Sequence, residues 1–296
     1  MVEWNRIHCQ DALKGFEEIE DNSVDCVLLD PPYNIGVDFG NNRYKKEIND
    51  YVEWCSQWVT QSERVLKDSG TMYIYGFSEI LAHLSVNMNL EHRWLIWHYT
   101  NKTVPSLNFW QRSHESILCA WKDRSKRIFN REDVREPYTD KFIQGYKDKG
   151  RKRPASKGRF GKDDTTEYTV NEKGALPRDV LKVSTLAGGA GMTKRIGWCK
   201  DCSKVFFGQE SKEHKGHDTF KHPTQKPFEL TRRLIAAVRP PDERGKILIP
   251  FAGSGSECII AKVLGCDYLG FDLNKEYVTM AEEFIERYHT TLEEYK

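Results

Sequence analysis

Short apolar segments that end at an acidic residue or a proline constrain the fold of this chain more than any other feature. Residues 25–30 (DCVLLD), 246–251 (KILIPF) and 267–272 (DYLGFD) have the composition of strands, and the apolar run at 27–29 suggests a strand that is buried on both faces. Further strands are expected at 6–9, 70–76, 93–100 and 115–122. Apolar residues at helical spacing mark 12–19, 51–67, 226–238 and 254–264, and Asn274 can cap a last helix through about Tyr288. This alternation predicts an α/β fold around a mostly parallel, doubly wound sheet.

The middle of the chain has a different composition. From residue 123 to about 220 it is charged, glycine-rich and only weakly periodic. Such a segment is typical of an insert or a loop-rich recognition region. We therefore expect three parts, at residues 1–122, 123–220 and 221–296.

Charge and hydropathy argue against a membrane or secreted protein. The formal net charge is +1, so the overall charge indicates no partner. No run approaches the roughly 18 apolar residues of a membrane span, and the first residues lack the order of a signal peptide. We expect a cytoplasmic protein whose eight cysteines are thiols or metal ligands rather than a disulfide framework.

The strand at 25–30 runs into a stiff corner formed by Asp30, Pro31, Pro32 and Tyr33. Two consecutive prolines cannot continue a helix or a sheet ladder, so they fix the backbone after the strand. The same residues could form an ordinary turn in which Asp30 caps the backbone and Tyr33 packs on the surface. A functional interpretation therefore depends on other motifs.

A glycine-containing turn, PFAGSGS at 250–256, follows one expected strand and opens an expected helix. Gly253 and Gly255 permit a tight turn and close approach of a ligand to the backbone. Asp272 ends the next strand, where a carboxylate can accept hydrogen bonds from ribose hydroxyls. Because the turn is shorter than a triphosphate-binding loop, it favours a nucleoside cofactor without a pyrophosphate.

Taken together, DPPY at 30–33 and FAGSGS at 251–256 resemble the amino-group DNA methyltransferases that use S-adenosylmethionine. Other matching pieces occur in the expected order, namely CQDAL (9–13), HESILCAWK (114–122), LPRDVLKVS (176–184) and HPTQKP (222–227). With the catalytic motif first and the cofactor motif last, the order is similar to the permuted β group of that family. The resemblance covers about residues 4–122 and 176–288. It implies a circularly permuted Rossmann-like sheet, with a catalytic half at 1–122, a target-recognition insert at 123–220 and a cofactor half at 221–296.

The resemblance also implies cofactor-binding residues. Asp272 would hold the ribose, and Asp11 with its neighbour Ala12 would contact the adenine of the cofactor. The remaining candidates would shape the pocket or close over the methionine end, namely Phe251, Ala252, Gly253, Ser254, Gly255, His222, Thr224, Lys226 and Pro227. One departure is Ile249, which stands where the family usually has an acid two residues before the phenylalanine.

The DPPY corner would be the catalytic centre, and DPPY is more typical of adenine-N6 than of cytosine-N4 enzymes. A base must leave the duplex before its exocyclic amine can react. The Asp30 carboxylate and the Pro31 carbonyl would accept hydrogen bonds from that amine, Pro32 would keep the corner rigid, and Tyr33 would stack on the flipped base. Cytosine-N4 methylation, RNA adenine methylation and a DNA-binding subunit without activity remain the alternatives.

Cys199, Cys202, His214 and His217 have the spacing C-x2-C-x11-H-x2-H, close to that of a structural zinc finger. The surrounding segment has little apolar material, so a metal would stabilise it efficiently. The alternative is two free thiols and two solvated histidines. We expect a structural zinc ion, because four protein ligands leave no open position for a substrate.

The segment from Lys141 to Lys162 contains nine basic residues and one acidic residue, with aromatic residues interleaved. It could follow a phosphate backbone, although runs of charge more often form solvated loops. The candidate DNA contacts are Lys149, Arg151, Lys152, Arg153, Lys157 and Arg159. The expected partner is double-stranded DNA, and a cognate restriction endonuclease and a homodimer remain open.

Overall fold

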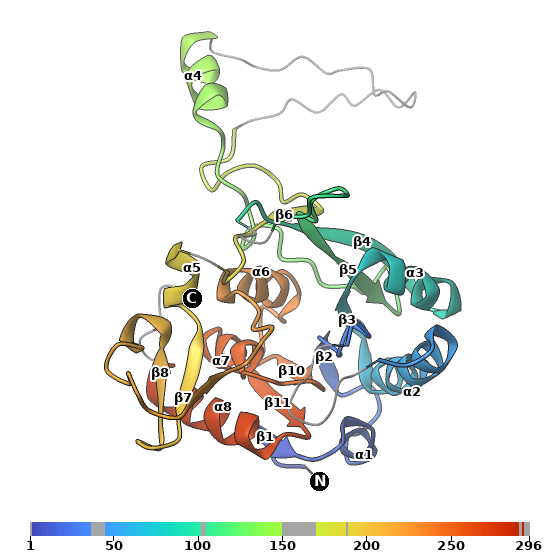
Figure 1. Ribbon diagram of the computed structural model, residues 1–296. Helices are drawn as coiled ribbons and strands as arrows, with labels where there is room; N and C mark the ends of the chain where they lie inside the picture. The colour runs from blue at the N-terminus through green and yellow to red at the C-terminus, as the bar shows by residue number, and fades with distance from the viewer. Residues whose placement is uncertain are drawn as a thin grey trace. The chain divides into compact units, whose positions relative to one another are not determined.

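The computed structural model describes residues 2–36, 45–101, 105–149, 170–187, 189–289 and 292 (Figure 1). The chain divides into two compact units. The first unit comprises Met1–Phe129 and Asp179–Lys296, and the second comprises Asn130–Arg178.

A mixed eight-stranded sheet forms the centre of the first unit, in the order β1-β11-β10-β2-β3-β5-β4-β6. Five of its seven ladders are parallel, and β5 runs antiparallel to both of its neighbours. The predicted α/β fold with a mostly parallel sheet is therefore confirmed. The strands are β1 (Arg6–Cys9), β2 (Val24–Leu29), β3 (Leu66–Gly76), β4 (Glu91–His98), β5 (His114–Trp121), β6 (Val180–Lys182), β10 (Lys246–Ile249) and β11 (Asp267–Asp272).

Helices cover both faces of this sheet (Figure 1). On one face α1 packs on α2 and α2 packs on α3, while α6, α7 and α8 pack on one another across the other face. Asn274 caps α8 as predicted, because its side chain accepts hydrogen bonds from the amides of Glu276 and Tyr277. The helices are α1 (Ala12–Glu17), α2 (Ile48–Val65), α3 (Ser78–Asn87), α6 (Phe228–Val238), α7 (Ser256–Val263) and α8 (Lys275–Tyr288).

The sheet order decides where the chemically important residues meet. β2, β10 and β11 are parallel, so their carboxyl ends lie at one edge of the sheet. β5 begins at the same edge because it is antiparallel to β3, with Ser116 opposite Gly76. The DPPY corner after β2, the glycine turn after β10 and the start of β5 therefore come together.

A second, three-stranded sheet lies against α8 in the same unit. It is formed by β7 (Ile196–Cys199), β8 (Lys204–Phe207) and β9 (Thr219–Lys221), with the short helix α5 (Gly189–Thr193) before it and the 3-10 helix η1 (Gly208–Glu210) after β8. The ring of Phe207 packs edge-on against Phe284 of α8, 5.4 Å away. The Val205 amide donates to the Glu283 carboxylate. Residues 196–221 thus pack on a helix that also covers the large sheet.

The second unit has little regular structure among its described residues. It contains α4 (Asp140–Lys149) and one isolated bridge between Glu136 and Ala175. The buried guanidinium of Arg135 pairs with Glu132 at 2.7 Å and donates to the Gly174 carbonyl. These polar contacts link the two described ends of the unit.

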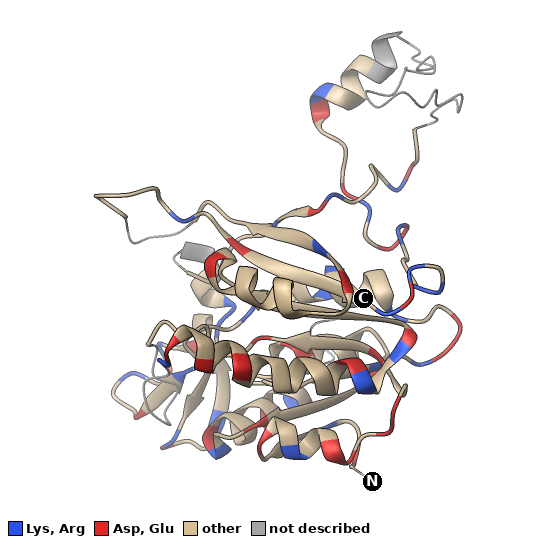
Figure 2. Ribbon diagram, turned by 90° about the vertical axis from the view of Figure 1, so that its right-hand side faces the viewer, with Lys and Arg blue, Asp and Glu red and all other residues tan. Residues whose placement is uncertain are grey.

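The helices on the side facing the viewer in Figure 2 carry basic and acidic residues interspersed with one another. This mixed pattern agrees with the formal net charge of +1. Within the described ranges, no helix combines the length and the apolar character that crossing a bilayer requires.

Candidate active site

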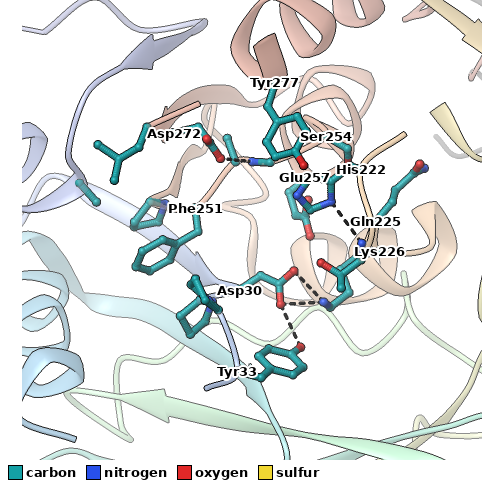
Figure 3. Close-up of a pocket in the computed structure, with 18 of the residues that line it drawn as sticks. Asp30, Tyr33, His222, Gln225, Lys226, Phe251, Ser254, Glu257, Asp272 and Tyr277 are labelled. Atoms are coloured by element: carbon teal, nitrogen blue, oxygen red, sulfur yellow. Dashed lines mark hydrogen bonds and ion pairs between the residues drawn. The ribbon is translucent and has the colours of Figure 1, made fainter. Parts of the chain in front are cut away.

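A cavity of about 460 Å³ opens at the carboxyl edge of the large sheet (Figure 3). This volume is typical of small-molecule sites. Most of the predicted site residues line it, namely Asp11, Ala12, Asp30, Pro31, Pro32, Tyr33, His222, Thr224, Lys226, Phe251, Ala252, Gly253, Ser254 and Asp272. Two predicted residues are not part of its lining. Pro227 is the N-cap residue of α6, and Gly255 is that of α7.

Both glycines of the turn after β10 have positive φ, 50° at Gly253 and 75° at Gly255. A Cβ at Gly253 would lie 2.7 Å from Nε2 of His222, and one at Gly255 would lie 2.7 Å from the Ala281 Cβ. Gly253 is therefore required by the wall of the cavity. Gly255 is required by the packing of α7 against α8.

Asp272 closes the turn from the end of β11. Its two oxygens accept hydrogen bonds from the amides of Gly253 and Asn274, each at 2.8 Å (Figure 3). Burial raises the pKa of this carboxyl group, and the two amides act against that shift. Asp11 is held similarly, because its side chain caps α1 by accepting from the amides of Leu13 and Lys14.

An aromatic wall borders the cavity beside the glycine turn. The ring of Phe251 lies 5.8 Å from the rings of both Trp54 and Trp58 of α2. Trp54 lines the cavity, and the sequence interpretation did not identify it. The wall offers an apolar surface for a flat ligand group.

At the DPPY corner, Asp30 forms a buried ion pair with Lys226 (Figure 3). The Lys226 ammonium lies 2.6 Å from each carboxylate oxygen of Asp30, and the side chains are 3% and 14% exposed, respectively. The Tyr33 hydroxyl lies 2.9 Å from Oδ1 of Asp30 and 3.1 Å from Oε2 of Glu115. HPTQKP was expected to close over the methionine end, and the structure shows that its lysine contacts Asp30 of the DPPY corner directly.

Charges around this corner influence one another. Burial alone would lower the pKa of Lys226, but the attraction of Asp30 and Glu115 raises it, so the lysine stays protonated. Burial raises the pKa of Glu115, with Lys226 opposing and Asp30 adding to the shift. Burial and the same two acids raise the pKa of Tyr33, so its hydroxyl is neutral.

The segment 222–226 is tied to the loop before β7. The Arg195 guanidinium donates to the carbonyl oxygens of His222 and Pro223, and the Ile196 amide donates to the Gln225 side chain at 2.8 Å. His222 is buried, and burial together with the charges of Lys226 and Arg195 lowers its pKa to about 3. The imidazole facing the cavity is therefore neutral at physiological pH.

Several residues of the site were missed by the sequence interpretation. Gln10, Lys46, Trp54, Gln225, Glu257 and Tyr277 also line the cavity, and Glu115 contacts Tyr33 next to it. A signal existed for two of them. Glu115 and Glu257 each lie beside an apolar run of a strand or helix. An acid that is buried in such a segment normally has a charged or hydrogen-bonding partner.

The four residues with zinc-finger spacing also come together. The ligand atoms of Cys199, Cys202, His214 and His217 all lie within 4.8 Å of one another. Sγ of Cys202 is 3.2 Å from Nδ1 of His217 and 3.6 Å from Nδ1 of His214, and Sγ of Cys199 is 3.3 Å from Nδ1 of His217. Cys199 ends β7, so the cluster belongs to the sheet that packs on α8.

The expected DNA contacts lie almost entirely outside the described residues. Lys149 is the last residue of α4, and Arg151, Lys152, Arg153, Lys157 and Arg159 fall within the undescribed range 150–169. Their contact with phosphate stays a prediction.

Comparison with known proteins places this geometry in a family. The chain is 28% identical to Type II methyltransferase M.HpaI of Haemophilus parainfluenzae over 94% of its own length and 73% of that protein. It is 26% identical to DNA adenine methyltransferase YhdJ of Escherichia coli (strain K12), over 91% of its own length and 79% of the relative.

Solved structures share the fold. The M1.HpyAVI complex with SAM matches with a TM-score of 0.53 at 19% identity, covering 94% of this chain and 98% of that one. The cytosine-N4-specific PvuII DNA methyltransferase matches with a TM-score of 0.58 at 14% identity, covering 98% and 93%. The model of the DNA methylase family (N6_N4_Mtase) matches residues 24–283, which include both the DPPY corner and the glycine turn. This chain belongs to the DNA methylase family.

Proposed function

We propose that this protein transfers a methyl group from S-adenosylmethionine to the N6 amine of an adenine that is flipped out of duplex DNA. The observation that carries the proposal is the Asp30 corner, which is fixed by two prolines and opens into a cavity that also contains Asp272 and the glycine turn. The relative named a DNA adenine methyltransferase supports adenine as the base.

The residues of the cavity fit the cofactor. Asp272 retains lone pairs beyond its two amide contacts, so it can accept hydrogen bonds from ribose hydroxyls. Gly253 leaves the backbone open to close approach, and the Phe251 wall provides an apolar surface for the adenine of the cofactor. When bound, S-adenosylmethionine supplies a methyl group on a positively charged sulfur, which is a good leaving group.

Asp30 is prepared to accept a hydrogen bond from the reacting amine. A carboxylate has about four lone-pair positions, and Lys226 and Tyr33 occupy three of those of Asp30. The remaining position, with the Pro31 carbonyl, would hold the two N–H groups of the amine and so localise its lone pair. The ion pair with Lys226 holds the Asp30 carboxylate in position, so the corner requires no reorganisation during transfer.

The chain order supports a circular permutation of the methyltransferase core. The strand before the DPPY corner precedes the strand before the glycine turn by more than 200 residues, yet β2 and β10 are adjacent and parallel. The catalytic half thus comes first in the chain, and the cofactor half follows.

The DNA would approach the same edge of the sheet. The loop between β4 and β5 starts there, and its side chains Leu107, Phe109 and Trp110 are 80–87% exposed. Large exposed apolar side chains beside a base-flipping site can fill the space that the base leaves or stack on unpaired bases. Tyr33 stays our candidate for stacking on the flipped adenine.

We further propose a structural zinc ion at Cys199, Cys202, His214 and His217. Bonds of about 2.3 Å to sulfur and 2.0–2.1 Å to nitrogen in a tetrahedron place sulfur and nitrogen about 3.6 Å apart. The sulfur–nitrogen distances of 3.2–3.6 Å in this cluster are close to that value. The ion would hold β7 next to the segment 222–226 and so support the site indirectly.

Relatives named Type II methyltransferases support a role beside a restriction endonuclease. The decisive experiment incubates the protein with radiolabelled S-adenosylmethionine and unmethylated DNA or RNA, and then separates the nucleosides by chromatography. We expect label in N6-methyladenine from DNA. Label in N4-methylcytosine would overturn the base assignment, and label in RNA alone would overturn the substrate. If neither nucleic acid is labelled, the proposed methyl transfer is wrong, and the alternative of a DNA-binding subunit without activity takes its place.

A further inference from the structure

Glu257, in the first turn of α7, is a buried acid whose carboxylate is only half satisfied. Its residue is 3% exposed, and it lines the cavity. The Ser256 hydroxyl donates to Oε2 at 2.7 Å, whereas Oε1 has no hydrogen-bond partner among the described residues. Leaving a buried acceptor unpaired is costly, so a donor that enters the cavity and reaches Oε1 would be bound favourably.

The other acids of the cavity are already engaged. Asp30 pairs with Lys226, Asp11 caps α1, and Asp272 accepts two amides. Among the four acids that line the described cavity, Glu257 alone has a buried oxygen without a partner. The cavity therefore has one carboxylate oxygen available for a cationic group.

Figure 3 shows where the Glu257 side chain lies. Glu257 is placed between Ser254 and His222 on one side and the Asp30–Lys226 pair on the other. A ligand whose ribose is held at Asp272 and whose methyl group faces Asp30 would bring its amino-acid end into this region. We propose that Oε1 of Glu257 binds the α-ammonium group at the methionine end of the cofactor. This proposal rests on the function proposed above.

This assignment would supply a carboxylate that position 249 lacks, where the family resemblance implies an acid and this chain has Ile249. Ile249 is 1% exposed at the end of β10 and is not part of the cavity lining. The carboxylate would come instead from residue 257, which reaches the same cavity from the helix after the glycine turn.

The electrostatics of the region favour an ammonium group. Burial, followed by repulsion from Asp30, raises the pKa of Glu257 to about 7, while the Ser256 hydroxyl and Lys226 act in the opposite direction. A bound ammonium would stabilise the ionised carboxylate. The neighbouring His222 is neutral and so does not compete as a cation.

The test compares two ligands by isothermal titration calorimetry. S-adenosylhomocysteine carries the amino-acid end, and 5′-methylthioadenosine has the same adenosine and thioether without it. The variants are Glu257→Gln, which retains the volume and can still accept from Ser256, and Glu286→Gln, which removes a charge from the exposed side of α8.

For Glu257→Gln we expect S-adenosylhomocysteine to bind about tenfold to a hundredfold more weakly, as for a lost charged hydrogen bond, with 5′-methylthioadenosine unchanged. Glu286→Gln should change neither. Equal weakening for both ligands, or no weakening, would overturn the proposal. If Glu257→Gln folds poorly, Glu257→Asp replaces it in the test. Because this variant keeps the charge on a shorter side chain, we expect a smaller weakening that is confined to S-adenosylhomocysteine. If the wild type binds neither ligand and methylates nothing, the proposed function fails rather than the role of Glu257.

Discussion

Replacing Lys226 by Met should destabilise the protein more than replacing Asp30 by Asn, although each change breaks the same ion pair. The reason lies in the neighbours. Lys226→Met leaves three acids, Asp30, Glu115 and Glu257, without their shared cation, whereas Asp30→Asn leaves the lysine facing two acids that still attract it. The pair is almost completely buried, so water cannot compensate for either loss.

The expected size follows from the geometry. Two unit charges 2.6 Å apart attract by about 6 kcal/mol at an effective dielectric constant of about 20. Desolvation of the two ions costs several kcal/mol each, so the intact pair adds little net stability. Removing one partner leaves the desolvation cost without the attraction, and Lys226→Met should therefore lower the free energy of unfolding by about 3–5 kcal/mol. The double variant Asp30→Asn, Lys226→Met should recover part of this loss.

Urea unfolding of the four proteins, followed by far-UV circular dichroism at pH 8 and pH 5, checks this prediction. Lys226 lowers the pKa values of Glu115 and Glu257, which burial raises, so in Lys226→Met both should rise further above their unfolded values. The folded state then binds more protons, so the stability deficit should shrink as the pH falls from 8 to 5. Equal losses for the two single variants, or a deficit that does not change with pH, would refute the reasoning.

Four further predictions concern the site and its surroundings. Asp30→Ala should reduce methyl transfer at least about a hundredfold without weakening binding of S-adenosylhomocysteine, measured by a labelled-methyl assay and calorimetry. Cys199→Ser should lose one zinc ion per chain by metal analysis, and zinc-free wild type would contradict the assignment. Trp110→Ala should reduce methylation of duplex DNA about tenfold with unchanged cofactor binding, and an unaltered rate would exclude its contact with DNA. Because the pKa of Glu257 is raised to about 7, stability should fall as the pH rises from 5 to 7, and Glu257→Gln should reduce this slope in urea unfolding.

The main elements of the fold could be predicted because their signals are local. The buried strands at 25–30 and 267–272 and the cap at Asn274 follow from apolar runs and from one side chain within hydrogen-bond reach of its own helix. The zinc-finger spacing was similarly informative, since two short loops bring its four ligand atoms together. Little of the secondary structure of the middle region could be predicted. Short strands such as β7 are stabilised by packing on α8 rather than by the hydrophobic pattern of their own residues.

Some features of the candidate site could likewise be predicted from the sequence, and others could not. The glycine turn and Asp272 could be identified because each lies at the end of a strand. Gly255 shows the limit of that reasoning, since its positive φ serves the packing of α7 on α8 as well as the turn. The sequence could not show that one glycine faces the cavity and the other faces a helix.

By itself, the sequence determined the α/β fold, the stiff corner at Asp30 and the glycine turn after β10, because these depend on residues close together in the chain. Only the tertiary structure decided which charges meet. Lys226 contacts Asp30 across 196 positions of sequence, and Glu115 meets Tyr33 across 82. Such pairings depend on the order of strands in the sheet and on the exclusion of water from their meeting point. The same burial leaves one oxygen of Glu257 without a hydrogen-bond partner in the part of the chain that the structure describes.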